Sequence, residues 1–379
     1  MSQRDTSTQK LKFGVHTFGD VTKSKDGSLL HDADVLRNVL NEGILADKLG
    51  IDAFGVGEHH RADFAISAPE TLLAGLATRT ENVRLNTAVT VLSTDDPVRV
   101  YQRFATVDAL SNGRAEPILG RGSFTESYPL FGYNLNEYNL LFEERLQIFS
   151  QLRDGGEVNW RGSTRTPLEN QNVFPKIEAA RMKSWVGVGG SPDSVVRAAR
   201  YDFPLMLPII GGSPSRFRPF VDLYHESMEK FGHENQEVAV HCPGFIAETD
   251  AEAKKTVWPH HQALFARIGR ERGWPPMQYD QFEYGANEDG ALFIGSPETV
   301  AQKIVKVSEQ LGINRFDMKY SNGTLPHEDC MESIKLFATE VIPRVHELRE
   351  ELRNRSNTKL RTASWLSWTW SVMTFSSTT

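Results

Sequence analysis

Short apolar runs alternate with longer amphipathic stretches along most of the chain. The short runs are rich in Val, Ile, Leu and Phe and have the length of buried β-strands. The longer stretches place apolar residues three or four positions apart, which is the spacing of one helix face. This pattern predicts eight strands, at residues 12–18, 53–57, 84–91, 115–120, 185–188, 204–208, 238–246 and 315–319. It predicts helices at residues 32–49, 69–80, 97–111, 137–155, 192–200, 214–231, 250–272, 297–311 and 327–352, the last interrupted near Pro343.

Eight strands alternating with helices favour an α/β fold, a single parallel (β/α)8 TIM barrel over residues 11–352. The rival is a doubly wound open sheet, which usually carries nucleotide-binding glycines after its first strand. Gly19, Asp20 and Val21 follow the first strand here and do not form such a loop. Irregular segments at 123–136, 162–183 and 273–291 predict insertions after strands four and seven, and the second of these segments also admits a hairpin. Residues 353–379 lack periodicity, so we expect an irregular, disordered tail and assign it no function.

The composition narrows the class of protein. The 379 residues carry a net charge of −7, so the chain lacks the basic excess that binds a nucleic-acid backbone. Its polar N-terminus has no secretory apolar segment, and no run reaches the roughly 18 apolar residues that a membrane span needs. Cys242 and Cys330 are too few for a metal cluster or a disulfide framework. We therefore expect a cytoplasmic protein with no metal and no membrane or nucleic-acid partner.

The first candidate site ends the second predicted strand, where Glu58, His59 and His60 follow one another. Side chains at the carboxyl ends of barrel strands line the active face. Because side chains alternate along a strand, one imidazole should reach the cavity while the other bonds in the wall. Alternatively, both are structural histidines. The pair His260–His261 lies in a predicted helix, and we interpret it as a surface feature.

Two further segments suit an anion. Gly189 and Gly190 leave room for a ligand beside the backbone, and Ser191 and Ser194 begin a helix whose N-terminus favours a phosphate. The same serine is equally typical of a plain N-cap. Arg121 ends the fourth strand between two glycines, where its guanidinium can reach a phosphate or a flavin ring, or form a salt bridge at the rim.

Several segments, in the same order, resemble the family of bacterial luciferase-like flavin-dependent monooxygenases. The match is carried by RLNTAVTVLSTDDPVR at 84–99, VDALSNGR at 107–114, the Gly120-Arg121-Gly122 run, the Glu58-His59-His60 triplet, GSPE at 295–298 and SIKLF at 333–337. The resemblance covers residues 11–351, which is nearly everything but the tail.

The resemblance implies a flavin-binding barrel, usually dimeric. His59 would stand at the position of the catalytic histidine, with Glu58 fixing its orientation. Residues 87–89 would lie under the flavin ring, with a cis peptide between Ala88 and Val89. The residues expected to bind the cofactor are Thr87, Ala88, Val89, Arg121, Gly122, Ser123, Gly189, Gly190, Ser191 and Ser194.

The sequence also departs from the luciferase α chain. That chain has a cysteine where Gly120 stands and a glutamate where Gly190 stands, although a Gly-Gly-Ser loop is common in the wider family. The missing cysteine argues against light emission from an aldehyde and leaves oxygenation or dehydrogenation open.

The function implied by the resemblance is oxidation of a small organic substrate with reduced FMN and O₂. His59 would act as a base or hydrogen-bond partner, since an imidazole titrates near neutral pH. Because the sequence lacks a dinucleotide-binding glycine fingerprint, a separate flavin reductase would deliver reduced FMN. Three alternatives stay open: an F420-dependent dehydrogenase, a non-catalytic flavin-binding subunit, and a cofactor-free barrel lyase or isomerase. Aromatic residues in 124–133 and 274–284 indicate an apolar substrate pocket, or the packing of long loops.

Overall fold

The strands form one parallel sheet that closes into a barrel. The computed structural model describes residues 10–24 and 26–355. The sheet order is β4-β6-β9-β10-β11-β13-β1-β2-β3-β5. β3 and β4 are successive parts of the third strand, and β5 and β6 of the fourth. Because β3 pairs with β5 and β4 pairs with β6, the two ends of this order meet and the ten strands occupy eight positions. The predicted single barrel is confirmed.

The barrel strands agree with the apolar runs of the sequence to within a few residues. Their bounds are β1 Lys12–Thr17, β2 Ala53–Val56, β3 Arg84–Thr87, β4 Thr90–Val91, β5 Ala115–Glu116, β6 Ile118–Gly120, β9 Trp185–Gly187, β10 Leu205–Pro208, β11 Val238–Ile246 and β13 Arg315–Lys319.

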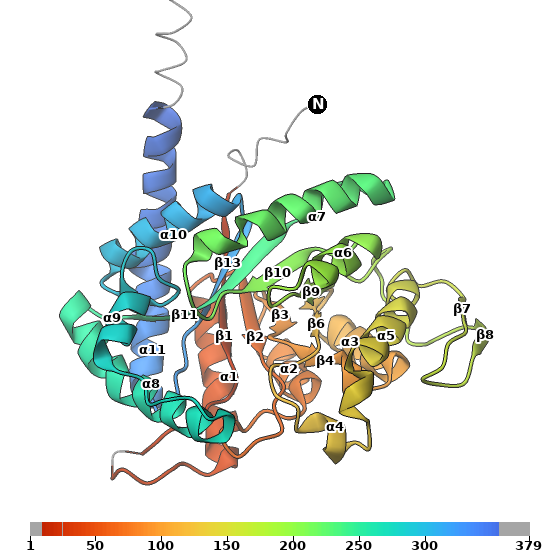
Figure 1. Cartoon of the computed structure of the whole chain (residues 1–379), viewed down its shortest axis with the longest axis horizontal. Helices are drawn as coiled ribbons and strands as arrows, with labels where there is room; N and C mark the ends of the chain where they lie inside the picture. Colours follow the sequence, from red (N-terminus) through yellow and green to blue (C-terminus); the bar gives the residue numbers. More distant parts are fainter. Residues whose placement is uncertain (1–9, 25, 356–379) are drawn as a thin grey trace, which may run out of the picture.

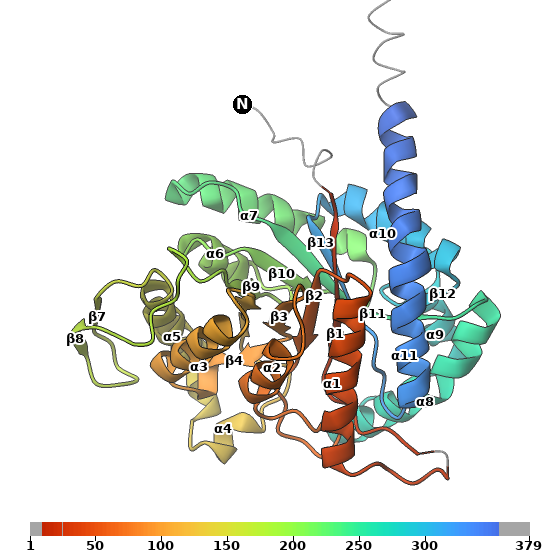
Figure 2. The same ribbon diagram turned by 180° about the vertical axis from the view of Figure 1, so that it is seen from behind.

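Helices surround this barrel, as Figures 1 and 2 show from opposite sides. They are α1 Asp32–Lys48, α2 Pro69–Ala77, α3 Pro97–Leu110, α5 Tyr138–Leu152, α6 Pro192–Arg200, α7 Arg218–Phe231, α10 Pro297–Leu311 and α11 His327–Leu336, with short 3-10 turns at Leu92–Thr94, Leu135–Glu137 and Pro214–Phe217. Local chemistry sets several starts. Asp96 accepts hydrogen bonds from the N–H groups of Val98 and Arg99 at the start of α3, and proline occupies the first turn of α2, α3, α6 and α10.

Both predicted insertions are present. After β6 the chain forms α4 (Ser127–Leu130), α5 and the antiparallel hairpin β7 (Val158–Trp160) and β8 (Leu168–Gln171), which lies at the edge of the molecule in both ribbon views. After β11 it forms α8 (Asp250–Arg272), α9 (Tyr279–Ala286) and β12 (Phe293–Gly295), which extends the sheet beside the end of β11.

One sequence prediction in this region was wrong. The segment 273–291 is not irregular throughout, because a capping box between Gln278 and Gln281 starts α9. The interruption of the final helix near Pro343 is confirmed, because α11 ends at Leu336, gives way to a π-helical turn at Phe337–Val341 and is followed by helix over residues 342–355. Residues 353–355 of the predicted tail are therefore helical, and 356–379 lie outside the described residues.

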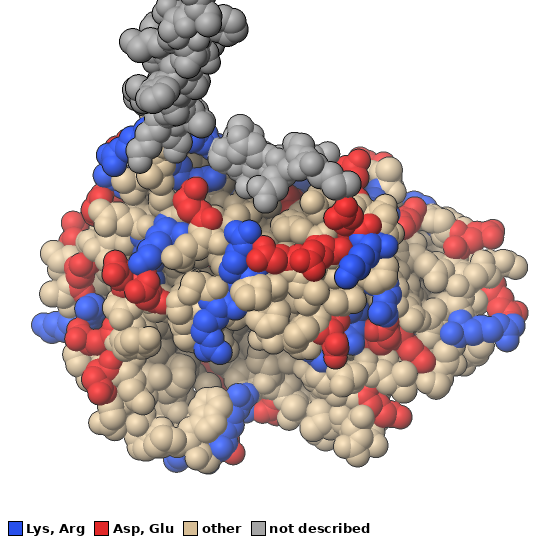
Figure 3. All heavy atoms as spheres, turned by 45° about the horizontal axis from the view of Figure 1, so that its top comes forward, with Lys and Arg blue, Asp and Glu red and all other residues tan. Residues whose placement is uncertain are grey.

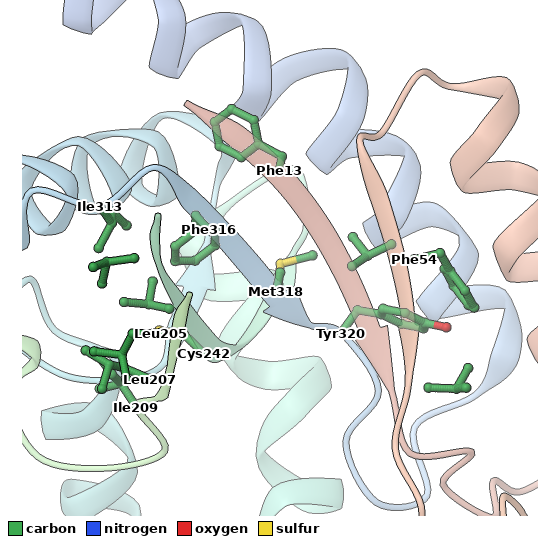
Figure 4. Packing of buried hydrophobic residues seen from close by; sticks show 14 of the residues in the cluster. Phe13, Phe54, Leu205, Leu207, Ile209, Cys242, Ile313, Phe316, Met318 and Tyr320 are labelled. Atoms are coloured by element: carbon green, nitrogen blue, oxygen red, sulfur yellow. The ribbon is translucent and has the colours of Figure 1, made fainter. Parts of the chain in front are cut away.

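Side chains alternate between the inside of the barrel and the helices outside it. Figure 4 shows Phe316, Met318 and Tyr320 among the apolar residues packed between strands and helices. The alternating Arg315, Asp317 and Lys319 contact the polar residues Asn86, His16 and Asp20 instead. The barrel interior thus combines a small apolar cluster, of Ile118, Trp185, Met206 and Ala239, with buried charges.

On the face shown in Figure 3, basic and acidic side chains are interspersed rather than gathered by sign. In the described part of the chain, no helix combines the length and apolar character required to cross a membrane.

Candidate functional site

The suspected segments all follow the carboxyl ends of barrel strands. Glu58, His59 and His60 follow β2, Arg121 follows β6, and the loop 188–191 joins β9 to α6. Because these strands are parallel, the three segments meet at one end of the barrel.

The His59 imidazole is buried in an aromatic enclosure. Only 8% of the residue is exposed, and its ring centroid lies 4.6 Å from that of Phe18, 4.5 Å from Phe64 and 5.3 Å from Phe124. The His59 N–H donates to the Ile66 carbonyl at 2.9 Å, which fixes the backbone. Its buried Nε2 has no hydrogen-bond partner among the described residues. A polar atom left in this state is suited to a ligand that completes the site.

This enclosure changes the acid–base chemistry of His59. Burial, opposed by the nearby Asp20 carboxylate, lowers the pKa of His59 to about 3. The imidazole is therefore neutral near pH 7, and it can accept or donate a hydrogen bond but carries no charge. Titration near neutral pH, which was expected from the residue type alone, does not hold for this enclosed imidazole.

Glu58 does not orient His59. One oxygen of its carboxylate lies 2.9 Å from Nε2 of His60, and the other accepts from the Val91 N–H at 2.7 Å. Glu58 thereby joins the end of β2 to β4. The alternation expected for the two imidazoles is seen, since His59 lies in the enclosure and His60 bonds in the wall.

The peptide between Ala88 and Val89 is cis, as the resemblance implied. The Val89 side chain fills the space beside Gly120 and Gly187, where an added Cβ would lie 2.5 Å and 3.1 Å from its methyl groups. Thr87 is buried, and its hydroxyl bonds to Thr90 and to the backbone of Ile118. The Thr87 side chain therefore holds strands three and four together.

Arg121 and Ser194 come together although they are 73 positions apart. The Arg121 Nη2 donates to the Ser194 Oγ at 2.9 Å, and Nη1 donates to the Asn139 Oδ1 at 2.8 Å. The guanidinium also lies over the Tyr138 ring, 4.8 Å from its centroid. Arg197 approaches the same hydroxyl at 3.4 Å. We call these four groups, Arg121, Asn139, Ser194 and Arg197, the anion cradle.

The loop before α6 adds backbone to this cradle. Ser191 is the N-cap of the nine-residue helix but makes no side-chain hydrogen bond to it within the described residues. A Cβ at Gly189 would meet nothing within 4 Å, and Gly190 has a positive φ of 112°. An open N-terminus beside two arginines favours a phosphate.

Two predicted binding residues have other surroundings. Gly122 has a φ of 77° and turns the chain after β6, with Val91 close to where its Cβ would be. Ser123 is exposed, and its carbonyl accepts from Arg272 of α8 at 3.1 Å. Ser123 thus ties the first insertion to the second.

Sequence reasoning missed several residues of this end of the barrel. Asn139 and Arg197 carry no local signal of their own, because each lies within a regular helix. His261 was wrongly assigned to the surface: it is 3% exposed, bonds to Asn322 at 3.0 Å and packs on Phe265 and Phe282. Only contacts across the fold distinguish it from the more exposed His260.

These residues fit an anionic cofactor with a ring. The cradle supplies cationic and hydroxyl groups for a phosphate, and the unpartnered Nε2 of His59 supplies a polar contact beside aromatic rings. Two hollows, of about 660 Å³ beside Trp258 of α8 and about 280 Å³ beside Lys12 and Arg315, lie elsewhere and include neither His59 nor Arg121.

The chain is similar to known proteins over most of its length. The sequence model of the luciferase-like monooxygenase family matches residues 11–315. The alkanal monooxygenase alpha chain of Photorhabdus luminescens is 22% identical over 88% of this chain and 99% of its own.

Three solved structures share the fold. Monooxygenase RslO1 from Streptomyces bottropensis has a TM-score of 0.75 and 21% identity, over 88% of this chain and 99% of its own. The oxygenating constituent of 3,6-diketocamphane monooxygenase from Pseudomonas putida, in complex with FMN, has a TM-score of 0.68 and 18% identity. An F420-dependent secondary alcohol dehydrogenase has a TM-score of 0.69 and 18% identity. The matches to these last two structures each cover 89% of this chain and 99% of the other chain. The family match over most of the barrel and the parallel barrel fold agree, and this chain belongs to the luciferase-like monooxygenase family.

Proposed function

We propose that this protein is a monooxygenase that uses reduced FMN and O₂ on a small organic substrate. The observation that carries the proposal is the pairing of Arg121 with Ser194 at the open N-terminus of α6, at the same barrel end as His59. FMN combines a phosphate with a ring, which are the two features that this end of the barrel suits. A separate flavin reductase is the source of reduced FMN, and the working form is a homodimer.

Each group then has a stated task. Arg121, Ser194 and the α6 backbone hold the phosphate, with Asn139 and Arg197 orienting them. Ala88 and Val89 support the ring, and the neutral His59 offers Nε2 as a hydrogen-bond partner to reacting atoms. The enclosure of Phe18, Phe64 and Phe124 keeps water from that nitrogen. When bound, reduced FMN supplies the electrons and reacts with O₂.

The phosphate contact is tested by fluorescence titration with FMN and with riboflavin, which lacks the phosphate. We expect Arg121→Ala to weaken FMN binding about 10- to 100-fold, since a hydrogen bond to a charged group is worth about 1.5–3 kcal/mol, and to leave riboflavin binding unchanged. Arg218→Ala is the matched control, because Arg218 lies in α7 and pairs with Asp222. Equal losses for FMN and riboflavin would contradict the proposed phosphate site.

The reaction is tested with supplied reduced FMN and an oxygen electrode, after subtraction of the O₂ that free reduced FMN consumes without protein. We expect wild-type protein to consume O₂ and His59→Gln to consume it at least about tenfold more slowly. The second candidate is an F420-dependent dehydrogenase, which is favoured by the likeness to such an enzyme at a TM-score of 0.69. Quenching by F420 but not by FMN, with no O₂ consumed, would select that candidate instead.

A further inference from the structure

Three polar side chains that the proposed function leaves unused form a chain inside the barrel. The His241 Nδ1 of β11 lies 2.8 Å from the His16 Nδ1 of β1. The His16 Nε2 lies 3.2 Å from an Asp317 oxygen, Oδ2, of β13. His16 and Asp317 have no exposed surface, whereas His241 is 6% exposed. The chain is therefore closed at Asp317 and opens only at His241.

The neighbouring strands are built to admit this chain. Asp317 pairs in register with His241 on one side and with Gly14 on the other. A Cβ at Gly14 would overlap the Asp317 carboxylate, and a Cβ at Gly55, the partner of His16 in β2, would lie 2.5 Å from the His16 ring. Gly14 and Gly55 thus leave room for the Asp317 carboxylate and the His16 imidazole. Small apolar residues at positions 317 and 16 would pack there as well.

Asp317 is held as a charged acceptor with a fixed orientation. Arg315 donates from Nε to Asp317 Oδ1 at 2.6 Å, and it also contacts Glu116 and Asn86. Burial opposes the charge of Asp317, but Arg315 and His16 outweigh it and hold the pKa of this carboxyl well below its usual range. The Oδ1 of Asp317 therefore accepts from Arg315, and its Oδ2 faces His16.

This arrangement selects one tautomer of each imidazole. The Asp317 carboxylate can only accept, and its negative charge 3.2 Å from the His16 Nε2 favours a proton on that nitrogen, although these two atoms do not form a hydrogen bond of standard geometry. A neutral His16 then accepts at Nδ1. His241 must then donate from Nδ1, which leaves a lone pair on its Nε2.

The free Nε2 of His241 belongs to the same end of the barrel as His59. The Phe18 ring stacks on His241, with centroids 6.0 Å apart and planes at 6°, and also contacts His59. The charged and titratable groups that face His241 are His16, Asp317, Lys319 and Arg315. Burial lowers the pKa of His241 well below its ordinary value, so this imidazole is neutral.

We propose that His241 is a second functional imidazole of the site, held by His16 and Asp317 in the tautomer that presents the Nε2 lone pair as a hydrogen-bond acceptor to bound flavin. The proposal rests on the proposed function for the identity of the ligand. His16 and Asp317 are positioning residues, because they act through His241.

The test is nitrogen-detected NMR of protein with ¹⁵N-labelled histidine, in which His241→Asn identifies the His241 signals. We expect wild-type His241 to show an unprotonated Nε2. Asp317→Asn should invert this tautomer, because Arg315 retains the amide oxygen and the amide NH₂ then faces His16. Addition of FMN should shift the wild-type Nε2 signal. Asp317→Asn should slow O₂ consumption with reduced FMN about tenfold or more.

The control is His261→Gln, which removes another buried imidazole that is not in the chain. It should leave the His241 signals and O₂ consumption unchanged. A wild-type His241 protonated on Nε2, an Nε2 signal that FMN does not move, or full activity after tautomer inversion would each overturn the proposal.

If Asp317→Asn does not fold, the activity of His241→Asn decides the question, because an asparagine retains the contact to His16 and lacks Nε2. If neither FMN nor F420 quenches wild-type fluorescence, the proposed function fails, whereas the tautomer measurement still tests the positioning by Asp317.

Discussion

At the scale of single residues, burial decides what the functional imidazoles can do. His59 has its pKa lowered to about 3 within its aromatic enclosure. An unfolded chain binds a proton on this histidine near pH 6.5, so between about pH 6.5 and 3 the unfolded state holds more protons than the folded state. The contribution of neutral His59 to stability is therefore complete above pH 6.5 and is lost as the pH falls.

We predict that His59→Gln reduces the acid sensitivity of the fold. Between pH 7 and pH 5, wild type should lose about 1–2 kcal/mol more unfolding free energy than the variant, as one proton on one group requires. Urea denaturation at the two pH values measures the difference, and His60→Gln is the control because His60 bonds to Glu58. Parallel losses in wild type and His59→Gln would show that the enclosure does not keep this imidazole neutral.

At the scale of elements, the third, fourth and fifth strands meet over Val89. The family's luciferase α chain has a cysteine at the position of Gly120, and here the Val89 methyl group lies 2.5 Å from where a Cβ would be. The Val89 side chain thus leaves no room for a side chain at position 120. This is a steric reason why glycine stands here where the luciferase α chain has cysteine.

We predict that Gly120→Cys costs about 1–3 kcal/mol of unfolding free energy, because overpacking forces Val89 to move. Adding Val89→Ala should recover at least half of that loss, with a coupling of about 0.5–3 kcal/mol in a double-mutant cycle. Gly156→Cys is the control, since a Cβ at Gly156 would meet nothing within 4 Å. Additive effects of the two substitutions in urea denaturation would exclude this steric explanation.

At the scale of the whole molecule, one arginine joins three segments that are distant in the sequence. Arg61, after β2, pairs with Glu126 of the first insertion and with Glu271 of α8, the latter at 2.8 Å. The Arg61 guanidinium lies 4.5 Å from the Phe124 ring centroid, and the Arg272 guanidinium lies 5.2 Å from the same centroid. Since Phe124 also contacts His59, this junction holds the two insertions over the site.

We predict that Arg61→Ala opens the first insertion locally without unfolding the barrel. Chymotrypsin should cleave the variant at the aromatic residues within 124–133 at least about fivefold faster than wild type, which corresponds to about 1 kcal/mol of local stability. The urea midpoint should change little. Arg344→Ala is the control, because Arg344 forms a surface ion pair with Glu298. Unchanged cleavage would mean that the insertions hold their place without Arg61.

The sequence alone determined the elements and the end of the barrel at which the candidate site residues gather. Helix and strand periodicity is local, so α6, α8, α10, β11 and β13 were predicted with their observed bounds. The positions of His59, Arg121 and Ser194 after strands were likewise readable, because parallel strands bring such residues to one end. Short elements that are shorter than one full period of the pattern, such as β12, were not predicted from the sequence.

The tertiary structure alone decided which side chains meet and what charge they carry. Glu58 contacts His60 rather than His59, His261 is buried, and His16 meets His241 across 225 positions. None of these follows from spacing, because hydrogen-bond partners and burial depend on strands that approach only when the barrel closes. The physical reason is that periodicity records which face of an element is covered, whereas a pKa or a tautomer depends on the particular atoms that cover it.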